Sequence, residues 1–366
     1  MSNDNGKGER WTIGVDLGDK DCSYCALDGT GAVVGQGRLR TTQAGFRSLF
    51  ENIESAKVVV ETGTHSSWVA ELLSSLGHEV LVADARKIEL ISRNARKSDR
   101  RDAELLARLG RVDLELLHPV KQRSTQVRRD LSILRSRAAL VATRTKLVNH
   151  VRGVAKFSGH RMRSCSARSF HKRVLDDVPV ELHPIFVPVL DVIEHLTEKI
   201  KVYEEQIETL CTTDYPQTAM LRQVNGVGPL TALCFVLTIE QPGRFKKGRD
   251  VGAYLGLVPR RDQSGGSDPE LRITKAGDQM LRTLLVQGAH YIIGPFGKDS
   301  DLRRFGLSLV KRGGQTAKKK AVVAVARKLA VLLRALWITG EVYEPLRNQH
   351  EPVDTATEVR STTLEA

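Results

Sequence analysis

The chain has 366 residues, of which 41% are hydrophobic and 27% are charged. This length predicts a folded protein of two or three domains with a sizeable core. Lysines and arginines number 56 against 43 aspartates and glutamates, which gives a formal net charge of +13. A surplus of this size predicts a polyanionic partner, either nucleic acid or an acidic membrane surface.

Nothing in the sequence predicts secretion or membrane insertion. The N-terminus has no apolar signal segment, and no apolar run approaches the roughly 20 residues of a spanning helix. The five cysteines are an odd number, and the Cys22–Cys25 pair has no second pair or histidine cluster to complete a zinc site. We therefore expect a cytoplasmic protein with structural thiols, without disulfides and without a membrane partner.

The first part of the chain carries an α/β pattern. Strands are predicted within residues 10–18, 22–39, 57–63 and 79–85, with an Asp-Gly-Thr-Gly turn inside the second range. Helices are predicted at residues 45–53 and 66–77. Hairpin strands followed by strands that alternate with helices indicate a mixed sheet, in the order of a ribonuclease-H-like fold.

From residue 119 to residue 215 the pattern changes to helix. Apolar residues repeat at alternating steps of three and four from Leu131 to Val148 and from Leu196 to Leu210. This spacing predicts two long amphipathic helices with a break near residues 160–173. They form either a coiled-coil arm that joins copies of the chain into a homo-oligomer or the core of an ordinary helical bundle.

Residues 216–345 predict a further, mostly helical domain, and residues 346–366 predict a polar, disordered tail. The turn that contains Gly226 and Gly228 is similar to the hairpin of helix-hairpin-helix DNA binders, where backbone N–H groups at a helix N-terminus bind a phosphate. A purely structural turn is the alternative.

A later helix combines an apolar stripe with a basic face. We expect the stripe to face the core and the basic face to bind phosphates, through Lys318, Lys319, Lys320, Arg327, Lys328 and Arg334. A solvated surface without a ligand is the alternative.

Four carboxylates, here called the acidic tetrad, are candidate metal ligands: Asp16, Glu61, Asp99 and Asp102. The first two lie in strands otherwise built for burial, where a carboxylate is costly unless it is compensated. The other two are spaced i, i+3 at a helix start and share one face. Such oxygens suit one or two Mg²⁺ ions, with Mn²⁺ as a substitute, and two ions can clamp a phosphodiester.

Basic residues surround the second half of the tetrad and suit a site that also holds phosphate, namely Arg96, Lys97, Arg100 and Arg101. Three of the four acids also have a structural explanation. Asp99 and Asp102 can satisfy a helix dipole, Asp16 can belong to a strand-end turn, and the charge run can be a solvated face. The G-x-D-x-G motif around Asp16 also opens the actin-like kinases and ATPases, but their second α/β half is missing here.

Ser264 lies in a Gln-Ser-Gly-Gly-Ser stretch that ends at Ser267, and three basic residues follow, which are Arg272, Lys275 and Arg282. Glycines beside a serine allow a ligand to approach the backbone and keep the hydroxyl accessible. The sequence has no GxSxG elbow with a downstream Asp and His, which disfavours acyl transfer. A flexible Gly/Ser turn is the alternative.

In this order, the motifs resemble those of the DEDD transposases of the bacterial insertion-sequence family IS110, which are related to the Piv DNA invertases. The resemblance covers nearly the whole chain, through GVDLGDK, VVVETG, KSDRRDAELLARL, NGVGPLTA, YLGLVPRRDQSGG, ITKAGDQMLRTLL and AVARKLAVLL. Ser98 stands where the family often has Thr, which is a mild departure.

The resemblance implies a RuvC-like domain of the ribonuclease-H fold over residues 1–118, a coiled-coil region over 119–215 and a C-terminal transposase domain over 216–345. It implies that the tetrad binds Mg²⁺ and that Ser264, or alternatively Ser267, forms a transient phosphoserine link with DNA. It further implies double-stranded DNA partners, namely element ends and target, a guiding bridge RNA, and a place at the bacterial nucleoid.

We therefore expect a site-specific DNA recombinase that excises and inserts its own element. The leading alternative is a metal-dependent hydrolytic nuclease or resolvase that uses the tetrad and water and forms no protein–DNA adduct. The second alternative is a catalytically inert nucleic-acid-binding or scaffold protein, which needs the same basic surface.

Overall fold

The computed structural model describes residues 10–84, 98–269, 271–314 and 316–349. The chain divides into two compact units, Met1–Arg123 and Ser124–Ala366. Within the described ranges, no helix is both long and apolar enough to cross a membrane.

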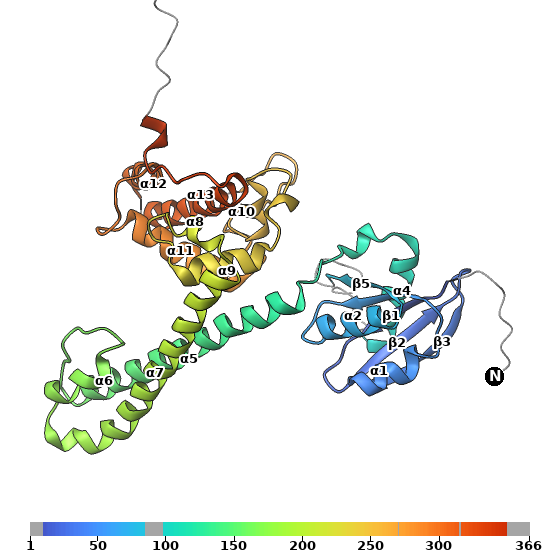
Figure 1. Ribbon diagram of the computed structural model, residues 1–366, viewed down its shortest axis with the longest axis horizontal. Helices are drawn as coiled ribbons and strands as arrows, with labels where there is room; N and C mark the ends of the chain where they lie inside the picture. Colours follow the sequence, from blue (N-terminus) through green and yellow to red (C-terminus); the bar gives the residue numbers. More distant parts are fainter. Residues whose placement is uncertain (1–9, 85–97, 270, 315, 350–366) are drawn as a thin grey trace, which may run out of the picture. The chain divides into compact units, whose positions relative to one another are not determined.

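The first unit contains a mixed five-stranded sheet in the order β3-β2-β1-β4-β5 (Figure 1). Its strands are β1 (Thr12–Asp16), β2 (Asp21–Leu27), β3 (Val33–Arg40), β4 (Lys57–Glu61) and β5 (Glu79–Ala83). The first three strands are antiparallel neighbours, whereas β4 runs parallel to both β1 and β5. The predicted α/β class and the predicted strands are confirmed.

Helices cover both faces of this sheet. Helices α1 (Gln43–Phe50) and α2 (Ser66–Ser75) pack on one face against Ile13 and Val15 of β1. Helix α4 (Asp99–Val112) packs on the other face, where Ala103 and Ala107 meet the buried side chains of β2. Because side chains alternate along a strand, Gly14 and Asp16 of β1 lie on the α4 face.

Gly14 allows α4 to approach β1 closely. A Cβ atom on Gly14 would lie 2.1 Å from the carbonyl oxygen of Ala103 and 2.4 Å from the backbone nitrogen of Ala107. A Cβ atom on Gly110, farther along α4, would lie 2.4 Å from the Cγ2 atom of Val59 of β4. Glycine at both positions therefore fixes the height of α4 above the sheet.

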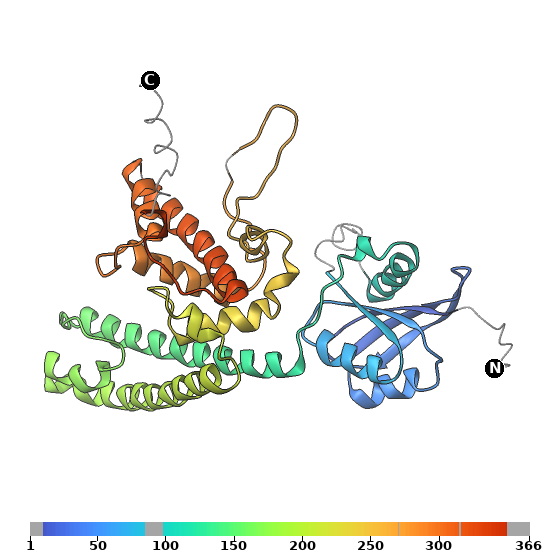
Figure 2. The same ribbon diagram turned by 45° about the horizontal axis from the view of Figure 1, so that its top comes forward.

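The second unit begins with two long helices, α5 (Thr125–Phe157) and α7 (His183–Thr213), which lie side by side (Figures 1 and 2). Arg137 of α5 contacts Glu204 of α7 at 2.6 Å, and Arg168 of the connection contacts the same carboxylate at 2.8 Å. The two predicted helices are confirmed, and the predicted break falls in the connection between them.

The rest of the second unit is helical. Its helices are α6 (Phe170–Arg173), α8 (Thr218–Leu221), α9 (Pro229–Ile239), α10 (Asp250–Tyr254), α11 (Gln279–Ile293), α12 (Asp301–Lys311) and α13 (Ala317–Thr339). Short 3₁₀ turns lie at Glu115–Leu117 in the first unit and at Leu175–Asp177, Val180–Leu182, Pro242–Arg244 and Arg347–Gln349 in the second. Helix α9 is buried from Thr231 to Ile239 and forms the centre of this core.

The predicted tail begins with residues that contact the second unit. The backbone N–H of Asn348 donates to Asp301 at 3.1 Å, and Pro345 just before the tail accepts from the N–H of Asp301 at 2.7 Å. Residues 350–366 lie outside the described ranges. The division into three domains and a tail remains a prediction.

We predict that Gly14→Val destabilises the first unit by about 3 kcal/mol, because the new side chain must displace the backbone of α4. The urea midpoint for exchange of the β1 amide hydrogens measures the effect. Gly63→Ala is the matched control, since a Cβ at Gly63 meets nothing within 4 Å. Equal midpoints for the two variants would contradict the close packing of α4.

Candidate active site

Asp16 and Glu61 lie together at one edge of the sheet. β1 and β4 are parallel and remain in register up to Val15 opposite Val60, and Asp16 and Glu61 are the next residues. Both side chains point to the α4 face because strand residues alternate. On the other side of β1, Asp16 pairs with Ser23 of β2, whose side chain is buried.

The second half of the tetrad lies in the first turn of α4. Ser98 caps this helix, and its hydroxyl accepts a hydrogen bond from the N–H of Arg101 at 3.4 Å. Asp99 and Asp102 follow the cap, where the helix dipole favours negative charge. Asp102 is only 4% exposed, whereas Asp99 is exposed. The predicted helix start is therefore confirmed.

The other three acids all act on the carboxyl group of Asp16. Burial makes the largest contribution to its raised pKa, followed by the charge of Glu61 and a hydrogen bond with Glu61. The charges of Asp99 and Asp102 act in the same direction and are smaller causes. Burial and the three other acids together raise the pKa of Asp16 from 3.8 to about 7. The structure thus brings the tetrad into one electrostatic cluster.

The donor chemistry of this cluster fits a divalent cation. Carboxylate oxygens are the ligands that Mg²⁺ and Mn²⁺ prefer, and a cation would relieve the repulsion that now favours a protonated Asp16. Among the described residues, no three His, Cys, Asp or Glu side chains already form a ready-made ligand set. Binding would therefore displace the hydrogen bond between Asp16 and Glu61 and draw the carboxylates together.

Two of the four basic residues predicted beside the tetrad can be placed. Arg100 and Arg101 are exposed at the start of α4, and Nε of Arg100 donates to Gln36 of β3 at 2.7 Å. Arg96 and Lys97 lie outside the described residues. The cysteines Cys22 and Cys25 are buried in β2, and burial raises the pKa of both thiols.

Figure 2 shows a long hairpin in the second unit. Ser264 and Ser267 pair with each other in this hairpin. The N–H of each donates to the carbonyl oxygen of the other, at 3.2 and 3.1 Å. The two glycines between them form the turn, and Gly265 has a φ of +58°, a conformation that glycine adopts without strain. All residues from 261 to 269 are exposed, so both hydroxyl groups are accessible.

The base of this serine hairpin (residues 256–277) is held by backbone pairs. The N–H of Arg260 donates to Arg272 at 2.9 Å, and the N–H of Lys275 donates to Gly256 at 3.1 Å. Gly277 has a φ of +73°, and a Cβ there would lie 2.1 Å from a neighbouring carbonyl oxygen. Arg272 and Lys275, both predicted to bind nucleic acid, are exposed along the hairpin.

Arg282 has a role that sequence reasoning missed. Its Nη1 atom donates to the carbonyl oxygens of Leu255 at 3.1 Å and Ala276 at 2.7 Å, so it joins the two ends of the serine hairpin. The sequence gives no sign that Arg282, six positions after Ala276, would bond to backbone carbonyls rather than to nucleic acid. Arg282 therefore positions the hairpin, and this use of its guanidinium limits the nucleic-acid contact predicted for it.

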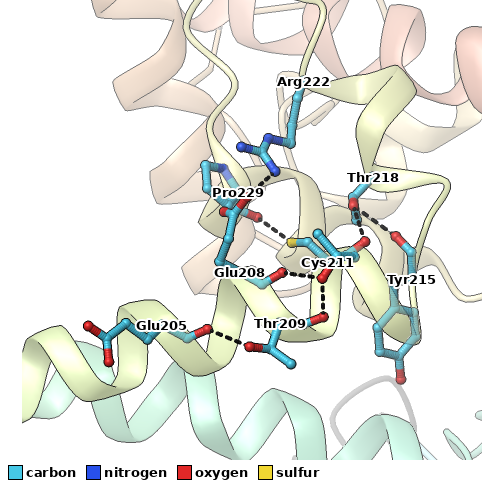
Figure 3. A network of polar contacts seen from close by, with 9 residues as sticks. Glu205, Glu208, Thr209, Cys211, Tyr215, Thr218, Arg222 and Pro229 are labelled. Atoms are coloured by element: carbon cyan, nitrogen blue, oxygen red, sulfur yellow. Dashed lines mark hydrogen bonds and ion pairs between the residues drawn. The ribbon is translucent and has the colours of Figure 1, made fainter.

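The turn before α9 contains both predicted glycines. Gly226 has a φ of +89°, and Gly228 is the N-cap of α9 without a side-chain cap. A network of polar contacts fixes this region against the end of α7 (Figure 3). In it, Arg222 contacts Glu208 at 2.7 Å, and Thr218 donates to the carbonyl of Cys211 at 3.1 Å.

Lys318, Lys319 and Lys320 are exposed in the first turn of α13, and the apolar stripe of that helix is buried, as predicted. The helix dipole adds positive potential at this end. Farther along, Arg334 does not belong to the predicted basic face. Its guanidinium donates to the backbone carbonyls of Pro242 and Phe245 at 2.9 and 2.7 Å.

Comparison with known proteins agrees with these observations. A DEDD transposase family model of the IS110 type matches residues 13–158, and a model described as "Transposase IS116/IS110/IS902 family" matches residues 218–301. A predicted transposase of Sinorhizobium fredii is 30% identical over 82% of this chain and 77% of its own length. The chain belongs to the IS110 family of transposases.

Other known proteins are similar to this chain over most of their length. The transposase for insertion sequence element IS1111A of Coxiella burnetii is 28% identical over 90% of each chain. The pilin gene-inverting protein of Moraxella bovis is 26% identical over 78% of this chain and 81% of its own. The first family match contains the whole tetrad, and the second contains Gly226, Gly228 and the serine hairpin.

The raised pKa of Asp16 predicts a pH-dependent stability for this IS110 transposase. Without metal, the folded state binds the extra proton between about pH 4 and pH 7, so stability falls as the pH rises through this window. Asp16→Asn removes the cost of charging Asp16, and we expect a melting temperature a few degrees above wild type at pH 8 but not at pH 4.

Melting curves from pH 4 to pH 8, with EDTA or with Mg²⁺, measure both effects. Mg²⁺ should raise the melting temperature of the wild type at pH 8 more than that of Asp16→Asn. Glu54→Gln is the control, because Glu54 is an exposed acid of the same unit. If wild type and Asp16→Asn gave parallel profiles, the electrostatic account of the tetrad would be wrong.

Proposed function

We propose that this transposase cuts, exchanges and rejoins DNA strands through a covalent phosphoserine intermediate. The convergence of three acids on the half-buried carboxyl of Asp16 carries the proposal, since such a cluster is costly unless it serves chemistry. The exposed serine pair at the tip of a fixed hairpin supplies a nucleophile.

The strand order of the first unit supports a RuvC-like member of the ribonuclease-H fold. In this proposal Asp16, Glu61, Asp99 and Asp102 hold Mg²⁺, which Mn²⁺ can replace. The bound cation would stabilise negative charge on the scissile phosphate. The fixed height of α4 above β1 keeps the two halves of the tetrad within reach of one another.

The serine hairpin performs the covalent step. The Oγ atom of Ser264, or of Ser267 across the turn, bonds to phosphorus as the bond from phosphorus to the leaving DNA oxygen breaks. The serine proton passes through solvent to the leaving oxygen, which departs as a free DNA hydroxyl. The phosphodiester energy is kept in the new ester, so rejoining needs no external energy source. Arg282 acts as a positioning residue that holds both ends of the hairpin.

Several exposed basic groups and backbone amides would bind double-stranded DNA at element ends and target. They are Arg100, Arg101, the Gly226–Gly228 turn, Arg272, Lys275, Lys318, Lys319 and Lys320. Their distribution over both units is suited to several strands rather than to one short contact. Assembly into a homo-oligomer through α5 and α7 also stays a prediction, which the molar mass in solution tests.

We expect DNA bound covalently to the protein to be visible on a denaturing gel after reaction with element-end DNA. Ser264→Ala should remove this adduct, because no hydroxyl remains at the attacking position, and Gln263→Ala should retain it as an exposed neighbour in the same hairpin. Asp16→Ala and Glu61→Ala should abolish the adduct while leaving nucleic-acid binding within about twofold.

Ser267→Ala and the double variant identify the nucleophile. Loss of the adduct in Ser267→Ala alone would transfer the role to Ser267. An adduct that persists in the double variant would refute the serine mechanism. Cleaved ends with free phosphate and no adduct in the wild type would favour a hydrolytic nuclease instead.

We also propose that a bridge RNA guides target choice, an idea that rests on the family and is compatible with the spread of basic residues. Purified from cells that carry the whole element, the protein should retain one abundant RNA encoded beside its own gene. Sequencing of the co-purified RNA checks this. A random mixture of cellular RNA would contradict guidance.

A further inference from the structure

A cavity of about 890 Å³ lies beside the turn that precedes α9. Its walls come from the turn itself, from the first residues of α9, from α11 and from the loop after α11. The volume falls within the roughly 300–1,000 Å³ of small-ligand pockets. We propose that this cavity binds one unpaired nucleotide of a nucleic-acid strand, a proposal that rests on the DNA-binding function above.

One end of the cavity suits a phosphate. Pro229 opens α9, so the backbone N–H groups of Leu230 and Thr231 are the free donors of its first turn. No side chain caps them, and a Cβ at Gly228 would meet nothing within 4 Å, so the approach is open. Lys298 lines the same cavity and makes no ion pair with any residue that the structure describes.

Thr231 gives independent evidence for a ligand. Its side chain lines the cavity and is only 8% exposed, yet its hydroxyl has no hydrogen-bond partner within the described part of the chain. The hydroxyl is not among the fully buried side-chain atoms that lack a partner, so it opens to the cavity, where a ligand oxygen can form a hydrogen bond with it. The unpaired hydroxyl and the free amides of the same helical turn thus point to the same bound group.

The other end suits a base. Tyr291 of α11 is 43% exposed, and its Cδ1 atom would lie 3.2 Å from a Cβ on Gly226, so its ring borders the turn. Gln287, one helical turn before Tyr291, and Asn225 of the turn both line the cavity. A tyrosine ring offers a surface for base stacking, and the two amides can bond to the edge of a base.

The charges of the cavity favour one phosphate rather than a larger polyanion. Arg222 is paired with Glu208 at 2.7 Å, and Asp299 is paired with Arg304 at 2.6 Å. Lys298 is therefore the unneutralised cation of the wall among the described residues. A base inside a duplex stays stacked on its neighbours and cannot enter, whereas an unpaired base can.

The test measures binding of oligonucleotides that carry one 2-aminopurine, whose fluorescence falls when it stacks on an aromatic ring. The full chain is used with Ser264→Ala and Ser267→Ala, so that no strand is cut. Tyr291→Ala should weaken binding of single strands by roughly 5- to 100-fold, the range for loss of one stacking contact, and should restore the fluorescence. Duplex affinity should change by less than about twofold.

Matched variants separate stacking from general damage. Tyr291→Phe keeps the ring and should retain single-strand binding, whereas Thr231→Val and Lys298→Ala should weaken it. Phe296→Ala is the control, because Phe296 is an 80% exposed aromatic close in sequence that does not line the cavity. DNA and RNA strands are tested in parallel, and binding of either supports the proposal and identifies the sugar.

Two results would overturn the inference. Unchanged single-strand binding in Tyr291→Ala would exclude the base pocket. An equal loss of affinity for duplex and single strands would show that the site contacts only the nucleic-acid backbone. Neither result depends on catalysis, because the covalent adduct is measured separately in proteins that retain both serines. A failed adduct assay with a positive 2-aminopurine assay would therefore reject only the recombination mechanism.

Discussion

The contact between α4 and β1 is the constraint on which the candidate active site depends. Gly14 allows the backbone of α4 to rest directly on the strand, with no side chain between them. Asp16 lies two residues farther on the same face, and Asp102 is the residue before Ala103, which makes the contact. The close contact that buries one face of α4 also brings the carboxylates of the tetrad together. The packing of α4 on β1 therefore offsets the repulsion between these carboxylates.

This arrangement explains why the tetrad is costly in the free protein. An acid in a strand is tolerated when it stays protonated or when a cation neutralises it. With a pKa of about 7, the protonated and the ionised forms of Asp16 are similarly populated near neutral pH. Glu61 is in register with Asp16 only because β4 is parallel to β1. The crossover from β1 to β4 therefore places Asp16 beside Glu61, although these two residues are far apart in the sequence.

Much of this was predictable from sequence. The strands, the start of α4 at Asp99 and the two long helices follow from periodicity and capping signals. Contacts made by long side chains were not predictable, because a guanidinium can reach carbonyls or phosphates equally well. Arg282 and Arg334 were thus expected on binding surfaces, and both instead donate to backbone carbonyls. Helix α12 was also not predicted individually, although Ser300 caps it and its apolar residues recur along the segment.

The second unit uses backbone rigidity in two different ways. In the serine hairpin, Gly256 and Gly277 fix the base, while residues 261–269 are exposed and a Cβ at Gly265 or Gly266 would meet nothing within 4 Å. At the turn before α9, Gly226 packs against α11, which leaves the free amides of Leu230 and Thr231 at a fixed place beside Tyr291. A nucleophile needs access to a phosphate that arrives from outside, whereas a nucleotide pocket needs walls set before binding. In the proposed function, the different placement of glycine in the two segments meets both needs.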